Sequence, residues 1–248
     1  MTTIKEMVAM IQQKAPFETA EPWDNSGLLA GDEDASVSTV LISLDITDNT
    51  IDQAIAAGAQ LMVCHHPVIF DPLRSLPATH PVYRLAQHGI AALCVHTNLD
   101  KATDGVNDCL AEQLGLKEIH VAPDGLSRIG RLPTTMTADN FGRYVGTALG
   151  TAVRVKRGTS PINTVAVCGG AGADLVLPLL EQADAAVTGE IKHDEWLLVP
   201  ASKTMIDGGH FHTENAVTKT LVRWLADAFP SLTIIMGTAE PPYETIKD

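Results

Sequence analysis

The stretch VLISLDITDNTIDQAIAAGAQLMVCHHP (residues 40–67) carries the pattern that decides the fold. Its apolar start predicts a β-strand over 38–45, and the following DNTIDQAIAAG (48–58) repeats its apolar residues at helical spacing, with Gly58 as the C-cap. A second apolar run predicts a strand over 61–64. A strand, a helix and a strand in succession are typical of a parallel sheet covered by helices.

The same alternation of β-rich runs and helical patterns continues along the chain, so we predict an α/β fold. The further predicted strands are 91–95, 164–168, 185–188, 203–206 and 232–236. The further predicted helices lie within 1–17, 103–115, 137–150 and 213–229.

Repeated spacings indicate an internal duplication. His65 follows Val40 by 25 residues, and Glu190 follows Val165 by the same number. A histidine is also followed four residues later by a carboxylate in each half, at His96–Asp100 and His210–Glu214. The strand–helix–strand unit is therefore expected to occur twice.

Two similar α/β domains follow from this duplication, and we place them at residues 1–125 and 126–248. The segment 118–162 has the weakest pattern. We expect it to join the halves and to belong structurally to the second, with Thr137 as an N-cap candidate.

Residues of the types that bind metals follow several of the predicted strands directly. Six of the nine histidines lie at four strand ends, namely His65, His66, His96, His193, His210 and His212. Open α/β sheets bind ligands at the carboxyl ends of their strands. Carboxylates from Asp100, Glu190 and Glu214 occur at the same ends. Imidazole with carboxylate suits divalent zinc, manganese, iron, cobalt or nickel, so the sequence predicts a metal site.

Adjacent side chains on a regular strand point to opposite faces, so His65 and His66 can serve one site only if the backbone turns there. Pro67 favours such a turn. The alternative interpretation is that one histidine ends the sheet and the other is solvated. In GGHFHTEN (208–215) we expect Thr213 to cap a helix and Glu214 to lie in its first turn, where the helix dipole favours a carboxylate.

Composition excludes several other functions. The formal net charge of −13 and the absence of a Lys/Arg run argue against binding to nucleic acid, because a phosphate backbone is bound by a basic surface. No apolar run has the length of a membrane span, and no signal peptide is recognisable. The four cysteines are scattered in apolar stretches without a C-x-x-C pair, which predicts free thiols and a cytoplasmic protein.

Five motifs together resemble a known family. They are WDNSGLLAGD (23–32), CHHPVIFDPL (64–73), HTNLDKATDGVND (96–108), TGEIKHDE (188–195) and GGHFHTEN (208–215). In this order they are similar to the GTP cyclohydrolase 1 type 2 homologues, also called Nif-three-like dinuclear metal-centre proteins. The resemblance implies two similar α/β domains facing each other across a cleft that holds two divalent metal ions per chain, in a toroidal homohexamer.

The resemblance also implies roles for the ligands. His66 and Asp100 would hold one ion, His65 and His210 the other, and Glu214 would bridge them. His96, His193 and His212 are candidates for moving protons, although the family more often has aspartate at Glu190 and a histidine slightly after His193. Trp23, Asp24 and Asn25 are expected to fix a loop.

Metal-assisted hydrolysis is the chemistry that this ligand set predicts. The family name implies that the substrate is GTP, whose guanine imidazole ring would be opened with release of formate. No glycine-rich phosphate loop or organic cofactor motif is present, but metal ions can hold phosphate oxygens. A metal-dependent phosphoesterase acting on a small phosphate and a non-catalytic metal-binding regulatory or scaffold protein remain as alternatives.

Overall fold

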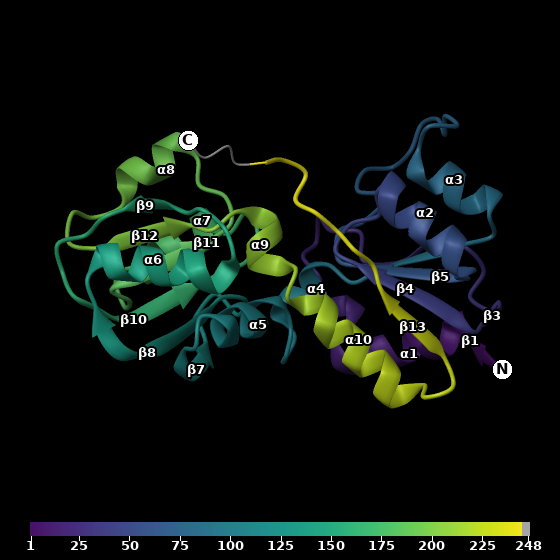
Figure 1. Ribbon diagram of the computed structural model, residues 1–248, viewed down its shortest axis with the longest axis horizontal. Coiled ribbons are helices and arrows are strands. Elements are labelled where there is room, and N and C mark those ends of the chain that lie inside the picture. Colours follow the sequence, from purple (N-terminus) through teal and green to yellow (C-terminus); the bar gives the residue numbers. More distant parts are fainter. Residues whose placement is uncertain (245–248) are drawn as a thin grey trace. The chain divides into compact units, whose positions relative to one another are not determined.

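The computed structural model describes residues 1–244, which form two compact units (Figure 1). The first comprises Met1–Thr103 and Val217–Glu240. The second comprises Asp104–Ala216, with Pro241 and the described residues after it. The first change of unit is therefore at residues 103–104 rather than at the predicted boundary of 125–126, and the chain returns to the first unit at Val217.

The first unit contains a five-stranded sheet in the order β13-β4-β5-β6-β2. The strands are β2 (Gly27–Ala30), β4 (Thr39–Ser43), β5 (Leu61–Cys64), β6 (Ala91–Cys94) and β13 (Thr233–Met236). All neighbours pair in parallel except β2, which is antiparallel to β6. Thr233 pairs with Thr39, so the yellow strand β13 lies beside β4 and brings the C-terminal segment into this unit (Figure 1).

Helices and short strands complete the first unit. They are β1 (Thr2–Thr3), α1 (Ile4–Lys14), η1 (Phe17–Thr19), β3 (Ser36–Val37), α2 (Asp48–Ala57), α3 (Pro81–Gln87), α4 (Thr97–Lys101) and α10 (Val217–Ala228). The left-handed φ of 63° at Gly58 ends α2, which confirms the predicted C-cap. Every residue of β5 and β6 is buried, as expected for central strands of a parallel sheet.

The second unit contains a six-stranded sheet in the order β7-β8-β10-β11-β12-β9. The strands are β7 (Lys117–Val121), β8 (Arg128–Met136), β9 (Arg154–Lys156), β10 (Ile162–Val167), β11 (Ala185–Thr188) and β12 (Thr204–Asp207). The helices are α5 (Val106–Gln113), α6 (Ala138–Leu149), α7 (Ala173–Leu179), α8 (His193–Leu198) and α9 (His210–Glu214). Because β7 pairs with β8, and β8 with β10, residues 117–121 belong to this sheet, although they precede the predicted boundary at residue 125.

The α/β class and all seven strands listed from the sequence are confirmed, within two residues at each end. Whereas β9 lies in AVRVKR (152–157), a strand-like stretch of the segment 118–162, the strands β1, β2, β3, β7 and β8 were not predicted. Each is antiparallel to its neighbour in the sheet, and β7 is largely exposed, so none has the continuous apolar run of a central parallel strand.

Both units contain three consecutive parallel strands with an antiparallel strand beside the third. The spacing between equivalent strands differs by one residue, because Val40 pairs with Leu61 whereas Val165 pairs with Ala185. Counted from these pairs, the residue equivalent to His65 is Gly189, and Glu190 lies one position further. The duplication thus stays a prediction supported by strand order, and the equal spacing of 25 residues is not a structural equivalence.

None of the helices within residues 1–244 combines the length and apolar character needed to cross a membrane.

We predict that Arg128→Ala will destabilise the second unit by about 3 kcal/mol. Arg128 is only 2% exposed, its Nε donates to Asp108, and its Nη1 donates to the carbonyl oxygen of Leu126 at 2.6 Å. The substitution leaves the Asp108 carboxylate without this guanidinium. Urea denaturation followed by circular dichroism measures the change.

Arg157→Ala is the matched control, because Arg157 also pairs with an aspartate, Asp139, but both side chains are more than half exposed. Solvent screens such a pair, so its unfolding midpoint should stay close to that of the wild type. Equal effects of the two substitutions would contradict the role given to Arg128.

Candidate metal centre

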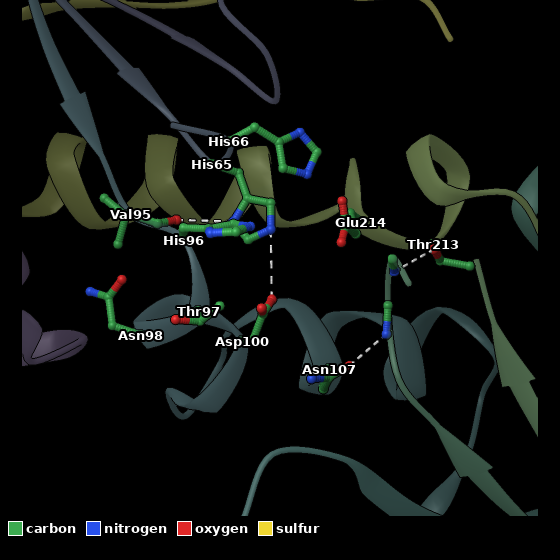
Figure 2. Close-up of polar contacts among 12 residues, drawn as sticks. His65, His66, Val95, His96, Thr97, Asn98, Asp100, Asn107, Thr213 and Glu214 are labelled. Atoms are coloured by element: carbon green, nitrogen blue, oxygen red, sulfur yellow. Dashed lines mark hydrogen bonds and ion pairs between the residues drawn. The ribbon is translucent and has the colours of Figure 1, made fainter. Parts of the chain in front are cut away.

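His65 directly follows β5, and its ring is fixed at one nitrogen. Nδ1 lies 2.9 Å from the carbonyl oxygen of Val95 (Figure 2). A carbonyl oxygen can only accept a hydrogen bond, so Nδ1 carries the proton and neutral His65 has its lone pair on Nε2. This Nε2 lies 3.6 Å from Oδ1 of Asp100 in α4. The buried imidazole therefore directs a metal-binding atom toward a carboxylate.

The backbone turns at His65 and His66, as Pro67 predicted. The amide N–H groups of both histidines donate to the same carbonyl oxygen, that of Leu44, each at 3.1 Å. Two successive amides that share one acceptor interrupt the alternation of a strand. As a result the two rings lie on the same side, with centroids 4.8 Å apart.

Carboxylates fix the next two rings of the first unit. His66 Nδ1 lies 2.7 Å from Oδ1 of Asp45, and His96 Nδ1 lies 2.7 Å from Oδ1 of Asp24. The ring of His96 lies 5.1 Å from that of His65 and 5.6 Å from that of His66. One nitrogen from each of the three histidines falls within 4.8 Å of the others, a grouping that could hold a metal ion.

Asp24 is a buried carboxylate that does more than fix a loop. It also accepts hydrogen bonds from the backbone N–H of Thr97 at 3.1 Å and from the Thr97 hydroxyl at 2.6 Å. Burial opposes its ionisation, but the hydrogen bonds from His96 and Thr97 outweigh burial and hold the pKa of this carboxyl well below its ordinary value. Asp24 therefore stays ionised and keeps the proton of His96 on Nδ1.

Asn98 is a structural residue of α4. Its Nδ2 donates to the carbonyl oxygen of Ala15 at 2.7 Å, and its Oδ1 accepts from the hydroxyl of Ser26 at 2.9 Å. The side chain is fully buried. Asn98 thus ties α4 to the end of α1 and to the segment before β2.

The second unit presents His210 and Glu214 on α9. His210 Nε2 lies 3.1 Å from Oε2 of Glu214, one helical turn later, and its Nδ1 lies 2.9 Å from Oε1 of Glu190. Glu190 follows β11 and orients the His210 ring, a role that the sequence did not reveal, although its place at a strand end was a signal. Asp45, at the end of the strand predicted over 38–45, carried the same signal.

The predicted cap at Thr213 is wrong. Gly209, with φ of 81°, is the N-cap, and α9 begins at His210, so Glu214 is the last residue of α9 rather than part of a first turn. The Thr213 hydroxyl instead accepts the backbone N–H of Gly170 at 3.1 Å (Figure 2). Gly209 can adopt this positive φ because it has no side chain, and α9 therefore begins at His210, before the predicted start.

A glycine loop after β10 lies against these ligands. Gly170 has φ of 62°, and a Cβ there would overlap the Glu214 carboxylate and come within 3.2 Å of His210 Nε2. The backbone N–H of Gly169 donates to Oδ1 of Asn107 at 2.8 Å, which holds the loop in place (Figure 2). The absence of side chains keeps space free around the two ligand atoms.

The remaining candidate histidines, His193 and His212, belong to none of the groups of described residues that could hold a metal ion. His193 is exposed at the start of α8. His212 is half-buried, and burial lowers its pKa, opposed by a hydrogen bond with the backbone of Leu149 at the end of α6. Because His212 lies two residues after His210, it points to the opposite side of α9. The structure therefore favours neither as a proton carrier at the ligands.

Comparison with known proteins identifies the family of the chain. A family model described as Duf34/NIF3 (NGG1p interacting factor 3) matches residues 2–241. The chain belongs to this family.

Relatives within the family carry a shared name. A protein of Lactococcus lactis, called a GTP cyclohydrolase 1 type 2 homolog, is 32% identical over 92% of this chain and 91% of its own length. One from Staphylococcus aureus with the same name is 38% identical over 57% of this chain, and the match spans only 39% of that longer protein. The crystal structure of Staphylococcus aureus hypothetical protein SA1388 superimposes with a TM-score of 0.90 at 28% identity, covering 98% of this chain and 99% of that one. The resemblance read from the five motifs is confirmed.

We predict that Gly170→Ala will weaken metal binding at least tenfold, because the added methyl group would displace the Glu214 carboxylate. Titration with Zn²⁺ in a calorimeter measures the affinity. Gly150→Ala is the control, because Gly150 has a similar φ of 69° but no atom within 4 Å of the added Cβ. If both variants bind Zn²⁺ as the wild type does, the glycine loop does not shape the site.

We predict that Asp24→Asn will lower the free energy of unfolding by about 1–3 kcal/mol at neutral pH, since hydrogen bonds to a buried charge are lost. The pKa of Asp24 is lowered in the folded state from 3.8, so its stabilisation is complete above about pH 4 and disappears as the pH falls through the folded-state pKa. The difference between wild type and variant should shrink below pH 4. Urea denaturation from pH 7 to 3, with exposed Asp71→Asn as control, tests this; a difference independent of pH would contradict it.

Proposed function

We propose that this protein is a hydrolase that depends on two divalent metal ions. In this proposal His66 and Asp100 hold one ion, His65 and His210 hold the other, and Glu214 bridges them. The ligand roles come from the family resemblance. The observation that carries the proposal is that each of the three proposed histidine ligands has its Nδ1 within 2.9 Å of an oxygen, so that Nε2 is the nitrogen that would bind a metal.

The donor set fits the proposed ions. Metal-bound imidazoles commonly donate their second N–H to a carboxylate or carbonyl, as seen for His65, His66 and His210. Neutral imidazole and carboxylate together favour zinc, manganese, iron, cobalt or nickel. In the first unit Asp100 adds a carboxylate beside His65, and in the second Glu214 adds one beside His210.

Bound divalent ions would supply a water of nearly neutral pKa and would polarise the substrate. Among the protein's own groups, His96 is the best placed general base, because its ring lies beside those of His65 and His66 and the anchored Nδ1 directs Nε2 as the nitrogen that would accept a proton. The Asp24 carboxylate would then stabilise the imidazolium that forms. His193 and His212 lack a comparable position.

The proposed reaction is hydrolytic opening of the guanine imidazole ring of GTP with release of formate. Its support is the name shared by the relatives, GTP cyclohydrolase 1 type 2 homolog, together with the ligand set. The toroidal homohexamer and the cytoplasmic location remain predictions that accompany this proposal.

We predict that Glu214→Ala will lose at least one of two bound ions per chain and will abolish any turnover, because no other carboxylate of α9 can replace the bridge. Metal analysis of the purified protein after reconstitution with Mn²⁺, Zn²⁺, Fe²⁺ or Co²⁺ measures the ions. Glu181→Ala, which removes an exposed glutamate from the same unit, should retain both.

Turnover is measured on the same samples. Formate released from GTP supports the cyclohydrolase, whereas phosphate released from nucleotide or sugar phosphates would identify a phosphoesterase. Two bound ions without either product would identify a metal-binding regulatory or scaffold protein. Full retention of two ions by Glu214→Ala would show that the bridging assignment is wrong.

A further inference from the structure

Two large aromatic side chains are exposed beside the histidines of the first unit. Trp23 is 59% exposed and Phe70 is 49% exposed. Their ring centroids lie 5.9 Å apart, with the planes inclined at 41°. Aromatic rings of this size normally gain stability from burial, so two neighbouring rings left open to solvent indicate a binding surface.

Both rings lie in an edge-to-face arrangement with the ring of His96. The centroid of Trp23 lies 6.2 Å from that of His96 with an interplanar angle of 75°, and Phe70 lies at 6.4 Å and 77°. His96 in turn lies beside His65 and His66. The aromatic pair therefore forms the rim of the three-histidine cluster in this unit.

The pair is held in place by the two residues that follow Trp23. Asn25 Nδ2 donates to the carbonyl oxygen of Ile69 at 2.6 Å, which ties the loop that carries Phe70 to the segment that carries Trp23. Asp24 ties the same segment to His96 and Thr97. The sequence Trp-Asp-Asn thus fixes the distance of both rings from the histidines, so a ligand would find the rings already in position.

We propose that Trp23 and Phe70 stack against a planar heteroaromatic ring of the substrate and hold it next to His96. This inference rests on the proposed function and names its substrate class. Stacking on aromatic side chains binds any flat ring, because every such ring has a π-face. The pair should therefore bind purines more tightly than pyrimidines through their larger area, with little selectivity between adenine and guanine.

A protein partner is the competing occupant, because Leu73 and Leu76 of the same loop are also exposed. The position of both rings beside His96 and the three-histidine cluster favours a substrate ring over a partner. Leu76 provides a matched control on the same loop.

The test is binding of guanosine, adenosine and uridine to the full-length protein reconstituted with Zn²⁺, measured by calorimetry, with ribose 5-phosphate as the ring-free probe. Trp23→Ala and Phe70→Ala should each weaken purine binding by roughly five- to a hundredfold. Trp23→Phe should recover most of the affinity, and Leu76→Ala should bind as the wild type does. The Zn²⁺ content should be the same in all variants.

Two results would overturn the inference. One is wild-type affinity for guanosine in both alanine variants, or no binding of any of the three nucleosides by the wild-type protein. The other is a change in oligomeric size, measured by light scattering, in Trp23→Ala, Phe70→Ala and Leu76→Ala alike without a change in purine affinity, which would identify a protein contact. Repeating the titrations after metal removal separates this inference from the proposed function, because ring stacking requires no ion.

Discussion

An imidazole that binds a metal through one nitrogen is usually held through the other, and this constraint shapes the candidate ligands of each unit. The carbonyl of Val95 holds His65, Asp45 holds His66, Asp24 holds His96 and Glu190 holds His210. A carbonyl oxygen and an ionised carboxylate can only accept a hydrogen bond, so with these acceptors each anchored nitrogen is the protonated one. The tautomer of the four neutral rings thus follows from four hydrogen bonds between residues distant in sequence.

The parallel sheet of the first unit brings two of these pairs together and supplies the histidine of a third. The strands β4, β5 and β6 are neighbours, and their carboxyl ends supply Asp45, the His65–His66 pair, and Val95 with His96. Residues more than 20 positions apart in sequence therefore come within hydrogen-bond distance, as at the strand ends of other open α/β sheets.

Local departures from regular structure make these arrangements possible. The shared acceptor at Leu44 turns two successive histidines to one side, and the positive φ angles of Gly170 and Gly209 let the backbone approach Glu214 and start α9 at His210. Family membership accounts for the fold that carries these features, whereas the reaction depends on the side chains placed there. The motif Trp23-Asp24-Asn25 is an example of such side chains. Asp24 orients His96, Asn25 anchors a neighbouring loop, and Trp23 exposes its aromatic ring.

The sequence by itself determined the α/β class, the central strands and the candidate ligands, because buried parallel strands are continuous apolar runs and metal ligands are chemically distinctive at their ends. It could not reveal that residues 217–240 return to the first sheet, since strand pairing between Thr233 and Thr39 leaves no local pattern. Nor could it show that Glu190, Asp45 and Asp24 orient histidines, or that Thr213 is no cap. Those roles depend on which side chains meet after folding, and hydrogen bonds between residues distant in sequence are decided only by the tertiary structure.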